Sequence, residues 1–165
     1  MSAGDVTRRP VTDRDQLFLL ELYAGTREAE LAQVPWTREQ KLAFVGLQFQ
    51  AQAVGYREAY PQGLHEIISI GDIPAGRIYW CRQADGIHIL DITVAAASRK
   101  KGIASSVLRD ILEEADRTAR SVSIYLETFN PSLAFFNRLG FHVALQDGFQ
   151  LLLKRPPAPS AQTAN

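Results

Sequence analysis

The chain has 165 residues, 46% hydrophobic and 22% charged, which is the composition of one globular domain with a core of its own. Eighteen basic and eighteen acidic residues give a formal net charge of zero, so charge offers no argument for a nucleic acid or an anionic membrane as a partner. The single cysteine, Cys81, excludes an internal disulfide and a cysteine-built metal site, and we expect it in the core.

Targeting and metal signals are absent from the sequence. No apolar stretch approaches the roughly 20 residues that span a bilayer, and the N-terminus lacks the apolar segment of a signal peptide. We therefore expect a cytoplasmic protein without a membrane partner. His65, His88 and His142 are too far apart in sequence to suggest a metal site, so no metal is expected.

The first third of the chain predicts a short strand and two helices. The strand covers residues 6–11, and Thr12 or Asp13 offers the N-terminal cap of a helix that should end near Gly25. Thr37 caps a second helix, and residues 55–63 are its expected exit loop.

From His65 onward the hydrophobic pattern becomes that of strands. Strands over residues 66–70, 75–82 and 87–94 are separated by the turns Gly71-Asp72 and Ala84-Asp85-Gly86, which predicts an antiparallel meander. The last of these strands is almost continuously apolar, as expected of a central strand that is buried on both faces.

The remaining elements predict a second half with parallel pairing. Apolar residues recur at helical spacing over 102–118, and residues 121–127 alternate as a strand, so this strand should pair in parallel with 87–94. A short helix should start at Asn130-Pro131-Ser132 and end at Gly140, before a hairpin whose turn is 146–148. We expect one domain over residues 1–155 and a disordered tail over 156–165.

A basic turn joins the buried strand to the long helix. It contains Arg99, Lys100, Lys101 and Gly102, and the helix begins directly after it. The first amides of a helix have no intrahelical partner and its dipole favours negative charge, so a basic loop at this position is a natural anion site.

Two blocks of sequence carry a family resemblance. Residues 99–104, RKKGIA, resemble the signature R/Q-x-x-G-x-G/A of the GNAT superfamily of N-acetyltransferases. Residues 130–141, NPSLAFFNRLGF, resemble that family's second block, N-x-x-A-x-x-x-Y-x-x-x-G-F or a close variant. The resemblance implies an α/β fold, with a mixed sheet of six to seven strands flanked by about four helices.

The resemblance also implies an activity and a co-substrate. Such a protein transfers the acetyl group of acetyl-coenzyme A to a primary amine of a small molecule, an amino acid derivative or a peptide, by direct attack in a ternary complex. The positions that match the family's cofactor contacts are Ile92, Thr93, Val94, Arg99, Lys100, Lys101, Gly102, Ile103, Ala104, Ser105, Asn130, Ser132 and Phe136. Asn130 could also cap the helix that follows it, which is compatible with a contact to the cofactor.

The catalytic groups are less clearly marked. Many family members place a tyrosine where this chain has Phe136, which carries no hydroxyl, so Ser132, Tyr125 or an ordered water is left to protonate the departing thiolate. Asp91 and Glu127 are candidate bases, each equally compatible with a salt-bridged or solvated carboxylate.

The resemblance implies that the amine acceptor contacts the region around the first two helices, which varies among family members. The residues expected there are Glu28, Glu30, Trp36 and Tyr56, where carboxylates beside aromatics suit an ammonium group. More simply, Trp36 could anchor the core and the glutamates could form a solvated face.

One other function and one assembly state are compatible with the sequence, and a third function is disfavoured. Because Phe136 lacks a hydroxyl, a non-catalytic acyl-coenzyme A binding or regulatory module is the alternative to an enzyme. A nucleotide-binding P-loop fits poorly, since the G-x-x-x-x-G-K-[ST] spacing is missing. The exposed edge expected at the C-terminal hairpin is compatible with a homodimer.

Overall fold

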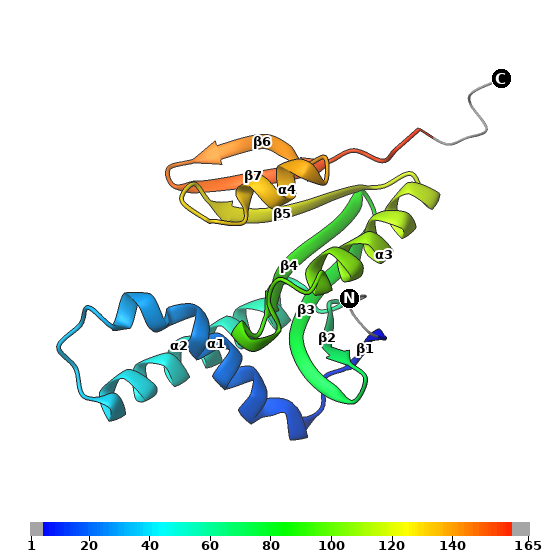
Figure 1. The fold of residues 1–165 in the computed structure, drawn as a ribbon. Helices are drawn as coiled ribbons and strands as arrows, with labels where there is room; N and C mark the ends of the chain where they lie inside the picture. Colours follow the sequence, from blue (N-terminus) through cyan, green and yellow to red (C-terminus); the bar gives the residue numbers. More distant parts are fainter. Residues whose placement is uncertain (1–4, 160–165) are drawn as a thin grey trace. The chain divides into compact units, whose positions relative to one another are not determined.

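A computed structural model describes residues 5–159. The elements, in chain order, are β1 (Val6–Pro10), the short 3-10 helix η1 (Asp13–Asp15), α1 (Gln16–Leu31), α2 (Arg38–Ala59), β2 (Leu64–Ile70), β3 (Ile73–Gln83), β4 (Gly86–Val94), the 3-10 helix η2 (Ala96–Ser98), α3 (Ile103–Arg117), β5 (Ser121–Glu127), α4 (Leu133–Arg138), β6 (His142–Asp147) and β7 (Gln150–Arg155) (Figure 1).

The strands form one mixed sheet. Over residues 5–159 its seven strands follow the order β1-β2-β3-β4-β5-β7-β6. Strand β4 pairs in parallel with β5, whereas β1 with β2, β5 with β7, and β6 with β7 are antiparallel. Together with the four α-helices of the described residues, this confirms the predicted fold class.

The chain forms two compact units, each discontinuous in sequence. Unit one comprises residues 5–78 and 92–104, and unit two comprises residues 79–91 and 105–159. Strands β3 and β4 contribute to both units. The single domain expected over residues 1–155 stays a prediction. Of the expected tail, residues 160–165 lie outside the described residues, and residues 156–159 form neither helix nor strand.

Unit one is built around the packing of α1, α2 and β2. Leu19 of α1, Phe49 of α2 and Ile67 of β2 are almost fully buried and form one apolar cluster. The ring of Tyr23 lies 5.7 Å from that of Phe49, so the two helices pack side by side. Since Leu19 and Tyr23 are spaced at i and i+4 and both pack in this cluster, one stripe of α1 faces this core.

Both helices of unit one are longer than the sequence predicts. Helix α1 continues through Gly25 to Leu31, and α2 continues through Gly55 to Ala59. The predicted ends near Gly25 and at Gly55 are therefore wrong. A glycine inside a helix costs only about 1 kcal/mol relative to alanine, and the packing of the two helices against each other offsets this cost. The predicted cap of α2 is confirmed, since Thr37 accepts a hydrogen bond from the Gln40 amide.

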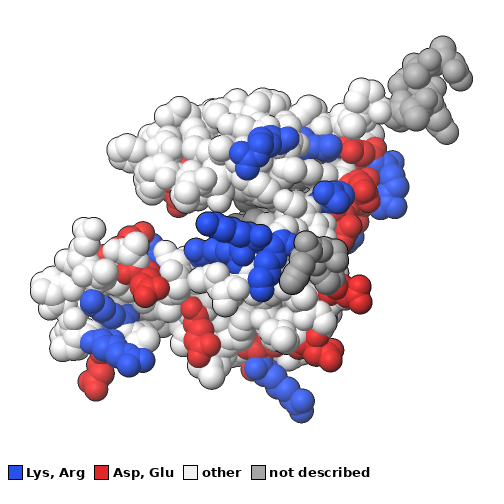
Figure 2. Space-filling view, in the orientation of Figure 1, with Lys and Arg blue, Asp and Glu red and all other residues white. Residues whose placement is uncertain are grey.

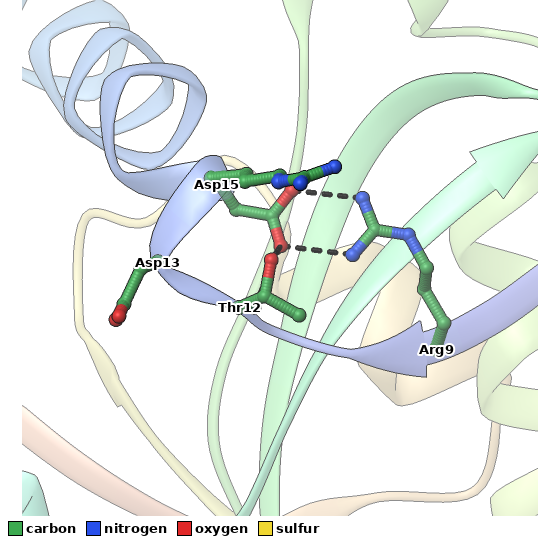
Figure 3. Close-up of a pocket in the computed structure, with 5 residues that line it drawn as sticks. Arg9, Thr12, Asp13 and Asp15 are labelled. Carbon is green, nitrogen blue, oxygen red and sulfur yellow. Dashed lines mark hydrogen bonds and ion pairs between the residues drawn. The ribbon is translucent and has the colours of Figure 1, made fainter.

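A bidentate ion pair fixes the loop between β1 and α1 (Figure 3). The Arg9 guanidinium donates to both carboxylate oxygens of Asp15, at 2.8 Å each, and the Thr12 amide donates to the same carboxylate at 2.8 Å. The Arg9 hydrogen bonds hold the pKa of Asp15 well below its usual range. This cluster anchors the start of α1 to the end of β1.

A buried arginine in unit one faces a neutral histidine. Arg77 of β3 is 5% exposed, donates to the Gln52 side chain at 2.8 Å and lies 3.4 Å from Nε2 of His65. Burial, and then the positive charge of Arg77, lower the pKa of His65 from 6.5 to about 4. His65 is therefore uncharged at neutral pH.

Acidification should weaken the fold through His65. The unfolded chain takes up a proton at this ring near pH 6.5, while the folded chain resists protonation until about pH 4, so stability falls as the pH drops across this window and levels off below it. We expect a loss of about 2 kcal/mol, after allowing for the partial solvent exposure of the ring. Urea midpoints over this pH range, for the natural chain and for His65→Gln, measure it. If the two curves fall in parallel, another group is responsible.

Unit two is built around α3, β5 and β7. Leu108 and Ile111 of α3, Val122 and Ile124 of β5, and Leu153 of β7 are almost fully buried. Val122, Ile124 and Leu126 alternate along β5 and share one face with Leu151 and Leu153. Cys81 is buried and burial raises the pKa of its thiol, so the predicted core position is confirmed.

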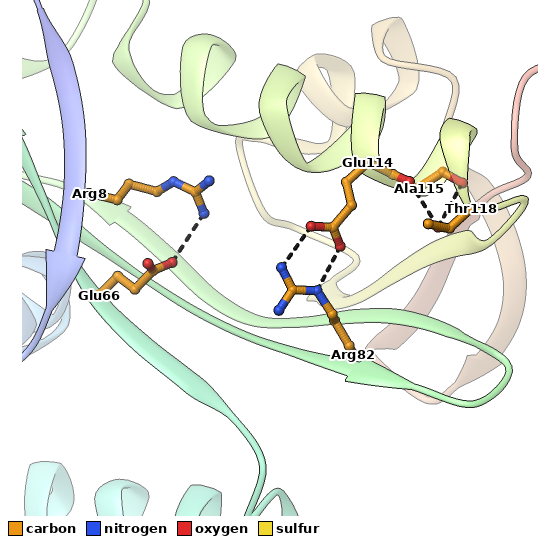
Figure 4. A network of polar contacts seen from close by, with 6 residues as sticks. All are labelled: Arg8, Glu66, Arg82, Glu114, Ala115 and Thr118. Atoms are coloured by element: carbon orange, nitrogen blue, oxygen red, sulfur yellow. Dashed lines mark hydrogen bonds and ion pairs between the residues drawn. The ribbon is translucent and has the colours of Figure 1, made fainter.

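Ion pairs connect strands to neighbouring elements within each unit (Figure 4). In unit one, Arg8 donates to Glu66 at 3.1 Å. In unit two, Arg82 donates to both oxygens of Glu114, at 2.8 and 2.7 Å, and its guanidinium lies 4.5 Å from the ring centre of Trp80. The Arg82 hydrogen bonds lower the pKa of Glu114. The exposed position of Arg82 makes each contact a modest contribution to stability.

In the part of the chain that the structure describes, no helix has the length and apolar character needed to cross a membrane. Over the same residues, no group of three or more His, Cys, Asp or Glu side chains could hold a metal ion.

Candidate functional site

The turn between β4 and α3 has an unusual backbone. Lys100 has a φ of 64° and Gly102 a φ of 73°, so two residues of this short segment are left-handed. A left-handed lysine is uncommon because its Cβ crowds the backbone, and such strain concentrates at binding sites. Successive amides in a turn that mixes left-handed and right-handed residues converge on an anion. The turn is therefore a candidate backbone cradle for an anion at the N-terminus of α3.

The cradle is open and positively charged. A Cβ atom placed on Gly102 would meet no other atom within 4 Å, so the protein leaves space beside this residue. Arg99, Lys100 and Lys101 are exposed, and lysine and arginine side chains gather over the segment between β4 and α3 in Figure 2. Over residues 5–159, none of these three side chains forms an ion pair, and Arg99 Nε donates to the Val94 carbonyl at 3.3 Å.

The end of β4 is held against β3 at short distance. The Ala95 amide donates to the Ala75 carbonyl at 2.7 Å, and the Thr93 carbonyl lies so close to Gly76 that no side chain fits there. Ile92, Thr93 and Val94 are half-buried. Gly76 thus fixes the position of the β4 backbone just before the basic turn.

A polar network follows β5 in unit two. The Asn130 side chain donates to Glu127 at 3.2 Å and accepts from the Ser132 amide at 2.8 Å. Helix α4 follows Ser132, which lies at the N-cap position but makes no side-chain cap hydrogen bond. The Asn130 side chain closes the turn before α4 by accepting from the backbone two residues later, so its role as a cap stays a prediction beside its contact with the co-substrate. Glu127 is exposed, as the alternative of a solvated carboxylate expects.

Phe136 is a core residue of unit two. It is 2% exposed, and its ring packs edge-on against Phe135 and Phe141, at 5.4 and 5.3 Å. The Phe141 amide donates to the Phe136 carbonyl at 3.1 Å, which closes the end of α4. Its packing explains an aromatic side chain at this position without any contact with a ligand.

A histidine contact of unit two was not expected from the sequence. Nδ1 of His88 lies 2.9 Å from the Ser123 hydroxyl, and the ring lies edge-on to Tyr125 at 5.4 Å. Burial lowers the pKa of His88. The parallel register sets His88 opposite Ser123, and this pairing could have been found from the alternation of the two predicted strands. Tyr125 is 46% exposed, and Asp91 is half-buried.

A groove runs between α1 and α2 in unit one. It has a volume of about 530 Å³. Its lining includes carboxylates from α1 and cationic side chains from α2, above an apolar floor; among these residues are Glu21, Glu28, Arg38, Lys41 and Val45. Glu28 therefore reaches a groove, whereas Glu30 lies 3.1 Å from Arg27 in an exposed ion pair.

The predicted aromatics of this region have different surroundings. Trp36 is 40% exposed and packs edge-on against Phe44 at 5.1 Å, so it is no core anchor. Tyr56 lies half-buried on α2.

The predicted cofactor residues form two sets. Residues 92–94 and 99–104 belong to unit one, whereas Ser105, Asn130, Ser132 and Phe136 belong to unit two. Within unit one the structure brings together the β4 end and the cradle, and within unit two it brings together Asn130 and Ser132.

Comparison with known proteins identifies relatives of this chain. The sequence profile of the acetyltransferase (GNAT) family matches residues 14–141. No curated protein matches the sequence. Among solved structures, the PaiA N-acetyltransferase from Thermoplasma acidophilum in complex with coenzyme A is similar with a TM-score of 0.69 at 14% identity, over 92% of this chain and 99% of that chain. An acetyltransferase from Thermus thermophilus has a TM-score of 0.66 at 19% identity, over 94% and 99%. The ribosomal-protein-S18-alanine N-acetyltransferase from Escherichia coli has a TM-score of 0.62 at 13% identity, over 98% and 99%. At these identities the likeness shows the fold.

Proposed function

Because the chain belongs to the acetyltransferase (GNAT) family, with a match over residues 14–141, we propose that it transfers the acetyl group of acetyl-coenzyme A to a primary amine. The acceptor is the amine of a small molecule, an amino acid derivative or a peptide. The observation that carries this proposal is the left-handed pair Lys100 and Gly102 at the start of α3, where a backbone cradle meets three exposed cationic side chains.

The basic turn and the start of α3 fit the phosphate end of this co-substrate. The amides from Lys100 to Ala104 in unit one, and the amide of Ser105, would bind the pyrophosphate, with Gly102 allowing close approach of the backbone and small Ala104 leaving the first helical turn clear. Arg99, Lys100 and Lys101 would add charge-assisted hydrogen bonds, including bonds to the ribose phosphate. Coenzyme A bound to the similar PaiA N-acetyltransferase supports the choice of ligand.

The remaining predicted residues are assigned to positioning and proton transfer. When bound, acetyl-coenzyme A supplies a thioester whose carbonyl carbon is attacked by the amine and whose thiolate leaves. The Ile92 and Val94 backbones would orient the pantetheine arm and polarise the carbonyl, and Asn130 would bond the same arm. Asp91 or Glu127 would take the proton of the ammonium, and Ser132, Tyr125 or a water would protonate the thiolate.

The acceptor is proposed to contact the groove between α1 and α2. Glu28 lies in its lining, and a carboxylate there suits an ammonium group. Trp36 and Tyr56 could add cation–π contacts.

The proposal is tested by binding and turnover together. Titration calorimetry with acetyl-coenzyme A should show binding at micromolar concentrations. A broad panel of primary amines, monitored by loss of thioester absorbance, should then show turnover with at least one acceptor. Binding without turnover on any amine would favour a non-catalytic acyl-coenzyme A module, which the buried, hydroxyl-free Phe136 keeps as the alternative. Absence of binding would reject both functions.

Truncating Asn130 should weaken acetyl-coenzyme A binding about tenfold, because the amide would lose a hydrogen bond to the ligand and the turn before α4 would lose its bond to Ser132. Calorimetry on Asn130→Ala measures the loss. Asn137→Ala removes the same side chain from an exposed position on α4 and should bind as the natural chain does. Equal affinities for both variants would remove Asn130 from the site.

A further inference from the structure

The edge strand of unit two is exposed along its whole length. Over residues 5–159, β6 is the last strand in the sheet order, beyond β7 (Figure 1). All six of its residues are exposed, and Val143 and Leu145 expose 52% and 61% of their surface. An edge strand presents main-chain donors and acceptors to a further strand, and exposed apolar side chains on such an edge favour its pairing.

A bulge determines which side chains of β6 share a face. The register with β7 shifts between Val143 and Leu145, so β6 has one residue more than its partner there. His142 lies opposite Lys154 and Asp147 opposite Gln150. Lys154 and Gln150 are an even number of residues apart, so they share a face, and therefore His142 and Asp147 share it as well. In a strand without the bulge, these two residues would point to opposite faces.

This arrangement makes the edge complementary to itself. We propose that β6 pairs antiparallel with β6 of a second copy of this chain, about a two-fold axis perpendicular to the sheet at the Ala144–Leu145 bond. A rotation about such an axis keeps each face of the sheet on the same side in both copies. Two residues that lie opposite each other across the dimer must therefore point to the same face of the sheet in each single chain. The axis sets His142 opposite Asp147 of the second copy and Val143 opposite Gln146, and the register meets this condition for both pairs.

The residues at the two ends of β6, His142 and Asp147, favour antiparallel pairing with a second copy of the chain. An imidazole N–H can donate to the carboxylate opposite, and the symmetry forms this contact twice. Parallel pairing in register would instead set histidine against histidine and aspartate against aspartate. Because a six-residue edge is a small interface, the dimer should form reversibly and depend on concentration.

Sedimentation equilibrium of the full chain, from low to several hundred micromolar, tests the proposal. The natural chain should show a monomer–dimer equilibrium. His142→Asp sets carboxylates against each other, Asp147→His sets imidazoles against each other, and each should weaken the dimer by about tenfold or more. The double variant His142→Asp/Asp147→His exchanges the partners and should restore dimerisation to within about threefold.

A matched control makes the same change of charge at a position outside β6. Asp85→His makes the same substitution at an exposed position in the turn between β3 and β4, and it should dimerise as the natural chain does. A monomer at every concentration, single variants that dimerise like the natural chain, or a double variant that stays as weak as the singles would each overturn the proposal. Circular dichroism establishes that every variant is folded.

Discussion

Replacing Gly102 with glutamate should lower the affinity for acetyl-coenzyme A by about a hundredfold or more while the protein remains folded. A φ of 73° is strained by about 1–2 kcal/mol for a residue with a Cβ, and a carboxylate at the cradle repels the phosphates that the amides would bind. The fold should tolerate the change because a Cβ at this position meets no atom within 4 Å. Titration calorimetry measures the affinity, and circular dichroism and urea unfolding measure the integrity of the fold.

Three control variants separate the causes of this loss. Gly102→Ala adds only strain, and Gly102→Gln adds the size of glutamate without its charge, so both should bind more tightly than Gly102→Glu. Gly71→Glu introduces the same residue at a φ of 58° in the turn between β2 and β3, also with no atom within 4 Å of the new Cβ. It should carry the same strain and bind acetyl-coenzyme A normally. Normal binding by Gly102→Glu would place the phosphates elsewhere.

Replacing Gly76 with alanine should destabilise the protein by about 2–3 kcal/mol, one of the larger effects expected of a single methyl group. The new Cβ would overlap the carbonyl oxygen of Thr93 and lie 3.1 Å from Cα of Val94, both backbone atoms that cannot rotate away. Strand β4 would have to move away from β3 just before the basic turn. Urea unfolding measures the loss of stability, and calorimetry should show weaker acetyl-coenzyme A binding in the fraction that stays folded.

The control for this prediction is a glycine with free space around it. Gly55 lies inside α2, and a Cβ there meets nothing within 4 Å. Gly55→Ala should therefore stabilise the chain by up to about 1 kcal/mol. If Gly76→Ala unfolded at the same urea concentration as the natural chain, the close approach of Thr93 would be relieved without cost and the role assigned to Gly76 would be wrong.

Local sequence patterns predict the fold well where one face of an element is buried. Strand β5 has the predicted bounds, Ser121–Glu127, because its alternating apolar residues all face the core of unit two. Helix ends were less predictable. Gly25 and Gly55 resemble signals for the end of a helix, yet both helices continue beyond them. The packing of α1 against α2 stabilises these extensions, and local sequence does not predict it because it joins residues far apart in the chain.

The residue types of the candidate co-substrate site could be predicted from the sequence, but its backbone conformation could not. The basic turn and its glycine are visible in the sequence, but the left-handed Lys100 is not, since a lysine does not favour that conformation. The closure of the turn by Asn130 onto Ser132 depends on side-chain orientation, which residue spacing leaves open. The β6 bulge has no sequence signal that we recognise, although it places His142 and Asp147 on the same face of the sheet.

The burial of Cys81 makes the chain suited to site-specific labelling. The only thiol of the protein is 4% exposed and its pKa is raised, so it should react slowly with maleimides under native conditions. A cysteine introduced at an exposed position in each unit, such as Gln50 on α2 and Arg109 on α3, would then carry a fluorophore or spin label without background from the natural residue. The distance between the two labels, followed as acetyl-coenzyme A is added, would report whether the two units move when the co-substrate binds.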